Sequence, residues 1–340
     1  MATARHITAR DSKSYLGPIE PLSGHYRINI EALSKHPLRL GAGQDQADRM
    51  DINGSGQSSR QGDDQARIPA GVAGSAPRIE LRHVRKTYPA RHGSVPALAD
   101  ITLHATESEF VSLIGPSGCG KSTLFTLIAG LAEPSAGEIL LRGESLASRT
   151  GRVGYMPQKD LLMPWRTVLD NVTLGPELRG QNRDTARRDA LGHFDAFGLA
   201  GFEHRYPAML SGGMRQRAAL LRTVLLGSDL LLLDEPFGAL DALTRADMQE
   251  WLLGIWEATR PTVLFITHDV EEALILSDRV YVLTERPAAI RAEVTVSLPR
   301  PRDYRLVATP EFAALKARLL GALRPSAGAL PTMPTTEAIR

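Results

Sequence analysis

The sequence contains one glycine-rich run whose residues are suited to binding phosphate groups. It comprises Gly115, Pro116, Ser117, Gly118, Cys119, Gly120, Lys121, Ser122 and Thr123. Glycines allow backbone N–H groups to surround a polyphosphate, Lys121 can reach the terminal phosphates, and the Ser122 hydroxyl can bind Mg²⁺ at the positive end of a following helix. The run follows the strand-like residues 110–114 and precedes the helix-like residues 124–131. We therefore predict binding of ATP or GTP with Mg²⁺, rather than a glycine-rich turn that matches by chance.

The elements around this loop are expected to form a sheet that delivers further polar residues to the same edge. Four leucines, 230–233, end in Asp234 and Glu235, and the apolar run 263–266 ends in Thr267 and His268. Both runs are typical of buried parallel strands, whose carboxyl ends form the ligand site of an α/β fold. The apolar patterns also predict an edge strand at 78–84, strands at 98–103, 153–158, 280–283 and 290–296, and helices at 184–197 and 311–323.

The composition is that of a globular protein with additional length. The chain has 340 residues, 43% of them hydrophobic, which suits roughly two domains. Forty basic and 38 acidic residues give a net charge of +2, so there is no electrostatic case for a nucleic-acid partner. Cys119 is the one cysteine, which excludes an internal disulfide framework. No apolar run reaches the roughly 18 residues needed to cross a bilayer, so we expect a chain that does not span a membrane.

Residues 1–77 form a segment of different composition. They are rich in Gly, Ser, Gln, Asp and Arg and show no sustained helical or strand period. Because such a composition cannot supply a core, we predict a disordered N-terminal tail. One alternative is a segment that regulates the protein or binds a partner. Another is a start codon assigned too far upstream of Met50.

Further motifs follow the loop in an order and spacing that together resemble the ATP-binding subunit of ATP-binding cassette (ABC) transporters. The most family-specific is residues 210–217, Leu-Ser-Gly-Gly-Met-Arg-Gln-Arg, which resemble the ABC signature. A Ser-Gly-Gly turn that opens a helix is suited to an anion, because its N–H groups and the helix dipole face outward. Alone, this segment would be interpreted as an ordinary serine-capped helix. The resemblance extends over about residues 79–302.

The resemblance implies a role for each matching residue. Asp234 corresponds to the carboxylate that helps to hold Mg²⁺, and Glu235 to the base that polarises the attacking water. His268 resembles the switch histidine at the γ-phosphate. Gln158, in the sequence Tyr-Met-Pro-Gln, resembles the Q-loop glutamine that contacts Mg²⁺ or water. Taken singly, the two acids could be solvated caps of a buried strand, and His268 a histidine at a strand end.

The resemblance also implies a dimer. In the family, the signature residues, here Ser211, Gly212 and Gly213, close over the γ-phosphate held by a second copy, so that two subunits enclose two ATP molecules head to tail. Asp241, at the end of the motif 238–241, matches the D-loop that crosses this seam. Tyr88 matches the aromatic residue that stacks on adenine, although a surface tyrosine near a strand end is also common.

For residues 78–309 the resemblance predicts an α/β, P-loop NTPase fold of the ABC cassette type, with a RecA-like core sheet, an antiparallel β part and a helical subdomain. Residues 310–340 would add a C-terminal helix and tail. One cassette without a membrane span implies separate integral-membrane permease subunits and, indirectly, an extracytoplasmic solute-binding protein. The chain would be an ATPase coupled to transmembrane transport, peripheral on the cytoplasmic face of the cell membrane.

Within importers, the chain resembles the nitrate, taurine and aliphatic-sulfonate group at residues 161–172, 239–245, 248–249 and 299–302. Thiamine-precursor importers share much of this pattern, so the cargo stays open. A non-transport ABC ATPase is a further alternative, but the long coiled coil or second cassette of such relatives is absent. A small-molecule kinase would need neither the signature nor His268. Trp165 lies either where a permease helix docks or in the core.

Overall fold

The computed structural model describes residues 77–91, 93–145, 148–238 and 240–324. The expected N-terminal tail therefore lies outside the described residues up to residue 76, and the expected C-terminal tail lies outside them from residue 325. Ala239, within the motif 238–241, also lies outside them.

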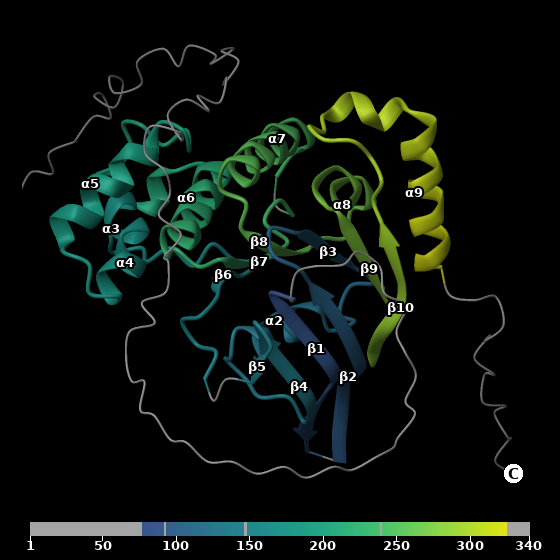
Figure 1. The fold of residues 1–340 in the computed structure, drawn as a ribbon. Coiled ribbons are helices and arrows are strands. Elements are labelled where there is room, and N and C mark those ends of the chain that lie inside the picture. Colours follow the sequence, from purple (N-terminus) through teal and green to yellow (C-terminus); the bar gives the residue numbers. More distant parts are fainter. Residues whose placement is uncertain (1–76, 92, 146–147, 239, 325–340) are drawn as a thin grey trace, which may run out of the picture.

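A ten-stranded mixed sheet forms the centre of the described part of the chain (Figure 1), in the strand order β5-β4-β1-β2-β10-β9-β3-β8-β7-β6. Its parallel part consists of β3 (Phe110–Ile114), β6 (Gly154–Met156), β7 (Leu230–Asp234), β8 (Thr262–Ile266) and β9 (Arg279–Leu283). Parallel neighbours end along one edge of a sheet. That edge carries the phosphate loop after β3, and it places the segments after β6, β7 and β8 side by side.

The antiparallel part contains β1 (Ile79–Ala90), β2 (Gly93–Ala105), β4 (Ala136–Leu141) and β5 (Glu144–Ser145). β10 (Ala288–Thr295) joins the two parts, because it pairs antiparallel with β9 and parallel with β2. The expectation of an edge strand at 78–84 is wrong, since β1 pairs with β2 on one side and with β4 on the other. Alternation of apolar residues reports which face of a strand is buried, not how many neighbours it has.

The helices lie on both sides of the sheet. α2 (Lys121–Ile128) follows the phosphate loop, and α3 (Val168–Val172), α4 (Leu174–Leu178), α5 (Arg183–Phe194) and α6 (Gly212–Leu225) gather in a helical part at one side (Figure 1). The remaining elements are α7 (Ala242–Thr259), α8 (Val270–Leu276), α9 (Pro310–Leu323) and the 3₁₀ turns η1 (Pro207–Met209) and η2 (Tyr304–Ala308). α5 and α9 are the helices predicted at 184–197 and 311–323. No described helix has the length and apolarity needed to cross a bilayer.

Two hydrophobic clusters cover the two faces of the sheet, and the leucine run of β7 contributes to both. Leu231 and Leu233 belong to one cluster, and Leu230 and Leu232 belong to the other. Because successive side chains of a strand point to opposite faces, an uninterrupted apolar run fits a strand that is covered on both sides. β3 and β8 contribute to the two clusters in the same alternating way. The carboxyl edge of the parallel strands, which carries the polar residues, therefore belongs to a sheet that is covered by a hydrophobic cluster on each face.

Candidate active site

The loop of residues 115–120 connects β3 to α2 at the carboxyl edge of the sheet. Gly118 and Gly120 have φ angles of 74° and 126°, which residues with a Cβ atom rarely adopt. Gly120 is also tightly enclosed, since a Cβ atom there would lie 2.9 Å from Leu98 Cδ2. No side chain caps the N-terminus of α2. The first N–H groups of this helix are therefore available to an anion.

Lys121 places a positive charge at this loop. The residue is 6% exposed, and its Nζ atom donates to the carbonyl oxygens of Gly115 (2.9 Å) and Pro116 (3.1 Å). The ammonium group is thus held against the loop rather than extended into solvent. A fixed cation beside free N–H groups is the combination that binds a polyphosphate.

Cys119 contributes to the loop through its backbone and to the core through its side chain. Its N–H group donates to the carbonyl oxygen of Pro116 at 3.3 Å. The side chain is 1% exposed and packs in the hydrophobic cluster on the α2 face of the sheet. Burial raises the pKa of the thiol, opposed by the nearby charge of Lys121. The side chain therefore acts as a small apolar residue beneath the loop.

Asp234 ends β7 with a carboxylate that is suited to a cation. The residue is 2% exposed and its Oδ1 atom forms no hydrogen bond. Burial raises the pKa of this carboxyl, while a hydrogen bond from Ser122 lowers it; the charge of Glu235 then raises it and that of Lys121 lowers it. A buried carboxylate oxygen without a partner, beside a serine hydroxyl, fits a hard cation such as Mg²⁺.

The protein side chains near Asp234 do not form a complete metal cage. Within the described ranges, no group of three His, Cys, Asp or Glu side chains could hold a metal ion. Mg²⁺ normally keeps several water or phosphate oxygens and takes only one or two protein ligands. Asp234 and Ser122 therefore fit a Mg²⁺ ion that also binds phosphate oxygens.

Three of the expected catalytic side chains meet at Glu235. Its Oε2 atom accepts a hydrogen bond from Gln158 Nε2 at 3.0 Å and lies 3.6 Å from His268 Nδ1. The three residues follow β6, β7 and β8, which are neighbours in the sheet. Glu235 has a φ angle of 46°, in the left-handed region that costs about 1–3 kcal/mol for a residue with a side chain. The backbone bond from Glu235 N to Ile266 O, at 3.0 Å, helps to hold this turn.

The signature residues do not join this group within one chain. Ser211 caps α6, where its hydroxyl accepts from Met214 N at 3.2 Å. In the described part of the chain, no hydrogen bond connects Ser211, Gly212 or Gly213 to the phosphate loop. Ser211 and Gly212 are exposed at the start of the helix. Their N–H groups are therefore not engaged by the phosphate loop of their own chain.

Asp241 lies beside the signature instead. Its carboxylate caps α7 by accepting from Thr244 N at 3.0 Å. A Cβ atom added at Gly213 would lie 3.3 Å from Thr244 Cγ2, so the starts of α6 and α7 are in contact. Tyr88 lies elsewhere, on β1, where Lys86 Nζ is 5.0 Å from the centre of its ring. Within the described residues, no hydrogen bond joins Tyr88, Ser211 or Asp241 to Glu235, whereas Gly238, at the start of the D-loop motif, donates to Glu235 O at 3.2 Å.

Sequence reasoning missed the arginines that attach the Q-loop segment to α6. Arg215 Nε lies 3.2 Å from Asp160 Oδ2, and Arg222 donates to the carbonyl oxygens of Asp160 (2.6 Å) and Leu161 (2.8 Å). The two arginines are seven residues apart, a spacing that places side chains on the same face of a helix. That spacing was the one signal available in the sequence, and it does not identify the partner.

Similarity to known proteins agrees with this geometry. Residues 98–238 match the family described as ABC transporter. A nitrate import ATP-binding protein of Synechocystis sp. is 40% identical over 252 residues, which cover 72% of this chain and 95% of that protein. An aliphatic sulfonates import ATP-binding protein of Burkholderia cenocepacia is 43% identical over 258 residues, covering 76% and 91%. The chain belongs to the ATP-binding subunits of ABC importers. This ABC subunit is therefore an ATPase coupled to transport.

Two further similarities extend the comparison. The formylaminopyrimidine import ATP-binding protein of Halalkalibacterium halodurans is 46% identical to the ABC subunit over 216 residues, covering 64% of this chain and 83% of that protein. A solved ATP-binding cassette, described as dimeric in a post-hydrolysis state with ADP and phosphate bound, superimposes with a TM-score of 0.58 at 29% identity. It covers 65% of the ABC subunit and all of its own length. The predicted α/β P-loop fold is thereby confirmed.

Proposed function

We propose that this ABC ATPase energises the uptake of a small solute of the nitrate, taurine or aliphatic-sulfonate class, with a thiamine precursor as the alternative cargo. The relatives named for nitrate and aliphatic sulfonates support the first class. The relative named for formylaminopyrimidine supports the alternative. In either case cargo is selected by the permease and by an extracytoplasmic solute-binding protein, which meets this chain only through the permease.

The meeting of Gln158, Glu235 and His268 is the observation that carries the hydrolytic part of the proposal. Glu235 is the one acid of the group, and we assign it the role of base that polarises the attacking water. His268 contacts the γ-phosphate, and Gln158 senses it. Mg²⁺, held by Asp234 and Ser122 with a water-mediated contribution from Gln158, would neutralise charge that develops on the phosphates.

ATP binding is assigned to the loop and to one aromatic residue. The N–H groups of the loop surround the phosphates, and the Lys121 ammonium pairs with the terminal ones. Pro116 has no N–H group, so the donors are those of Gly115, Ser117, Gly118, Cys119, Gly120, Lys121, Ser122 and Thr123. Cys119 takes part only through its N–H group, since its side chain lies in the core. Tyr88 stacks on adenine through its ring, which is partly exposed on β1.

A second copy of the chain is needed to complete each site. Ser211 and Gly212 are exposed at the N-terminus of α6, Gly213 beside them is buried, and none of the three forms a described hydrogen bond with the phosphate loop of its own chain. We assign them to the γ-phosphate of ATP on a second copy, in a head-to-tail dimer whose seam includes Asp241. The dimeric state described for the solved cassette supports this arrangement. Loss of the γ-phosphate would remove the bridge and open the seam.

An exposed apolar surface supports docking to a membrane permease. Trp165 is 74% exposed, which contradicts the alternative of a core-packing tryptophan. Leu161 is 60% exposed on the same segment. The backbone bond from Val168 N to Arg205 O, at 2.8 Å, brings the segment of Trp165 next to that of Tyr206, which is 47% exposed. Exposed aromatic residues of this kind mark interfaces. We propose that this surface binds the permease and thereby holds the chain on the cytoplasmic face of the membrane.

The proposal is tested with the purified chain and its Glu235→Gln variant. Loss of the base should abolish turnover while leaving ATP binding intact, because the loop and Lys121 are unchanged. Size exclusion with ATP and Mg²⁺ should then reveal a trapped dimer of the variant. Wild-type turnover by Glu235→Gln would overturn the assignment of the base. A wild-type chain without ATPase activity, alone or with a co-expressed importer permease, would overturn the function.

A further inference from the structure

A buried carboxylate that the proposed reaction does not use lies directly behind the site. Glu272, on α8, is 6% exposed. Burial raises the pKa of its carboxyl, and a hydrogen bond from Thr267 opposes the increase. Burying a carboxylate is costly unless several donors satisfy it. The groups that donate hydrogen bonds to Glu272 therefore show which segments of the chain this residue holds in place.

On one side, Glu272 binds the end of β8. Thr267 Oγ1 donates to Glu272 Oε2, and the same hydroxyl oxygen accepts from Asp269 N at 3.0 Å. These two residues flank His268. The backbone on either side of the histidine is thus tied, through one hydroxyl group, to the carboxylate of Glu272.

On the other side, Glu272 binds α7. Gln249 Nε2 donates to Glu272 Oε1 at 3.0 Å, and Arg245 Nε lies 3.7 Å from the same oxygen. Arg245 Nη2 donates to Leu240 O at 3.0 Å, and Arg245 N donates to Asp241 O at 2.9 Å. Arg245 therefore links the carboxylate to the residues that begin α7, including the D-loop aspartate.

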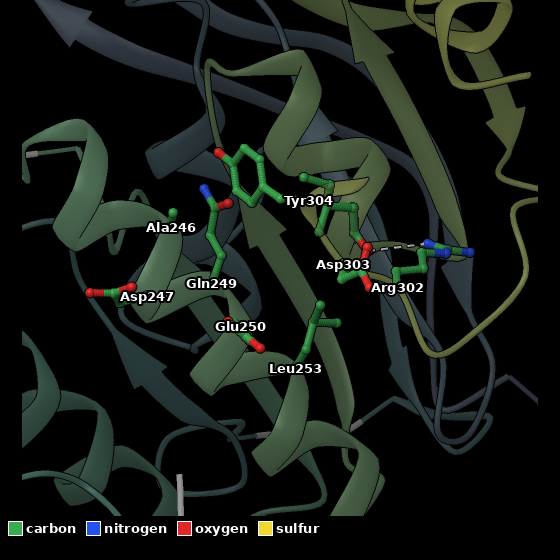
Figure 2. Close-up of a pocket in the computed structure, with 9 residues that line it drawn as sticks. Ala246, Asp247, Gln249, Glu250, Leu253, Arg302, Asp303 and Tyr304 are labelled. Carbon is green, nitrogen blue, oxygen red and sulfur yellow. Dashed lines mark hydrogen bonds between the residues drawn. The ribbon is translucent and has the colours of Figure 1, made fainter. Parts of the chain in front are cut away.

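The α7 side of this network is incomplete. Arg245 Nε and Gln249 Oε1 are buried without a hydrogen-bond partner, a state that is unfavourable for each group. Gln249, 1% exposed, lines a pocket of about 150 Å³ together with Asp303 and Tyr304, and its side chain points towards Tyr304 (Figure 2). A shift of α7 towards α8 that shortens the 3.7 Å separation of Arg245 Nε and Glu272 Oε1 to about 3 Å would form the missing bond.

We propose that Glu272 is a positioning residue that couples the switch histidine His268 to Asp241 at the dimer seam. The inference rests on the proposed function, because it assumes that His268 meets the γ-phosphate and that Asp241 meets a second copy. When the seam closes and moves the start of α7, Arg245 and Gln249 carry that displacement to Glu272, and Thr267 passes it to His268. The histidine would then reach its working position only in a closed dimer.

The test compares Glu272→Gln with Glu271→Gln. An amide at position 272 offers one acceptor oxygen to donors from Thr267, Gln249 and Arg245, so at least one donor loses its acceptor. Glu271 is the neighbouring acid on α8, and it pairs with Lys316 on α9 instead. Both variants remove one negative charge, and only the first disturbs the network.

We expect kcat for ATP hydrolysis to fall about ten-fold or more in Glu272→Gln while KM for ATP changes less than about two-fold, because only the placement of His268 changes. Glu271→Gln should retain both values. In a Glu235→Gln background, Glu272→Gln should also raise the ATP concentration needed to form the dimer. If Glu272 had only a structural role, Glu272→Gln would lower thermal stability without lowering kcat selectively over KM.

Thr267→Val provides an independent variant if Glu272→Gln does not fold. Valine has nearly the shape of threonine but cannot donate to Glu272, so the same loss of kcat is expected. The double variant that combines Thr267→Val with Glu272→Gln should lose no more kcat than either single variant. Both substitutions break the same connection between Thr267 and Glu272. Normal kcat in Thr267→Val would overturn the inference, as would equal kinetics of Glu272→Gln and Glu271→Gln. The inference about Glu272 can fail while the proposed function stands. That is the case if Lys121→Ala, which removes the cation of the phosphate loop, abolishes ATP hydrolysis in the same assays.

Discussion

Gln158 Nε2 donates a hydrogen bond to Glu235 Oε2 across 3.0 Å, although the two residues are 77 positions apart in the sequence. The carboxylate oxygen that we assign to the attacking water is therefore engaged by the glutamine of the neighbouring strand end. Glu235 has a left-handed backbone, so its side chain depends on such contacts for its direction. The pair forms the direct link between the ends of β6 and β7.

Replacing this glutamine should separate catalysis from binding. In Gln158→Ala, Glu235 loses the donor that orients it, and we expect kcat for ATP hydrolysis to fall by about ten-fold or more. The affinity for ATP should change little, because the phosphate loop is untouched. Steady-state kinetics and nucleotide titration measure the two effects. Lys159→Ala, at the adjacent exposed position, is the control, and equal kcat values for the two variants would contradict the prediction.

Two glycines of the phosphate loop should respond differently to alanine. Both have positive φ angles, so each alanine carries backbone strain of about 1–2 kcal/mol. Only at Gly120 does the new methyl group also meet other atoms, Leu98 Cδ2 at 2.9 Å and the backbone oxygen of Ala97 at 3.1 Å, whereas Gly118 has open space. We therefore expect Gly120→Ala to lower the free energy of unfolding more than Gly118→Ala does. Denaturant titration of both variants measures the difference, and equal losses would show that the contact with Leu98 is relieved without cost.

Replacing Asp234 should stabilise the fold and remove the metal site. Its pKa is raised mainly by burial, so the folded state binds the proton more tightly than the unfolded state does. The contribution of this carboxyl to the stability of the folded state is therefore fully present below the unfolded-state pKa, and it is lost as the pH rises through the folded-state pKa. We expect Asp234→Asn to unfold at a higher temperature than the wild type at neutral pH, with a difference that shrinks at acidic pH, and to lose Mg²⁺-dependent hydrolysis.

The matched control for this prediction is Asp229→Asn, just before the same strand. Arg78 and Arg142 form ion pairs with Asp229, so its loss should lower stability at neutral pH. Thermal unfolding across a pH series distinguishes the two aspartates. A destabilised Asp234→Asn variant would mean that contacts of the charged carboxylate outweigh the cost of its burial.

The exposed tryptophan should matter for assembly and not for hydrolysis. Trp165→Ala removes a side chain that is 74% exposed, so ATPase activity of the isolated chain and its thermal stability should stay near wild-type values. Co-purification with a co-expressed importer permease should decrease, because a large aromatic contact is lost. Leu320→Ala, which removes a 42% exposed side chain on α9, should leave co-purification unchanged. Equal recovery of permease by both variants would remove Trp165 from the interface.

The sequence by itself determined the α/β fold and the order of its polar residues along the chain. Largely apolar runs identified β3, β7 and β8, because a strand that is covered on both faces buries side chains of both faces. The residues that follow these strands could then be assigned to one edge. The motifs gave the residue types of the candidate site, but their roles in binding and hydrolysis stay predictions until the variants are measured.

Tertiary structure decided the features that depend on contacts between distant segments. It placed β1 inside the sheet rather than at its edge, turned the Cys119 side chain into the core and left Trp165 exposed. It also brought Glu272 between Thr267 and Gln249, an arrangement that no spacing in the sequence predicts. Local patterns report which face of an element is buried. Which side chain meets which across that face depends on strand order and helix packing, and these are set by the chain as a whole.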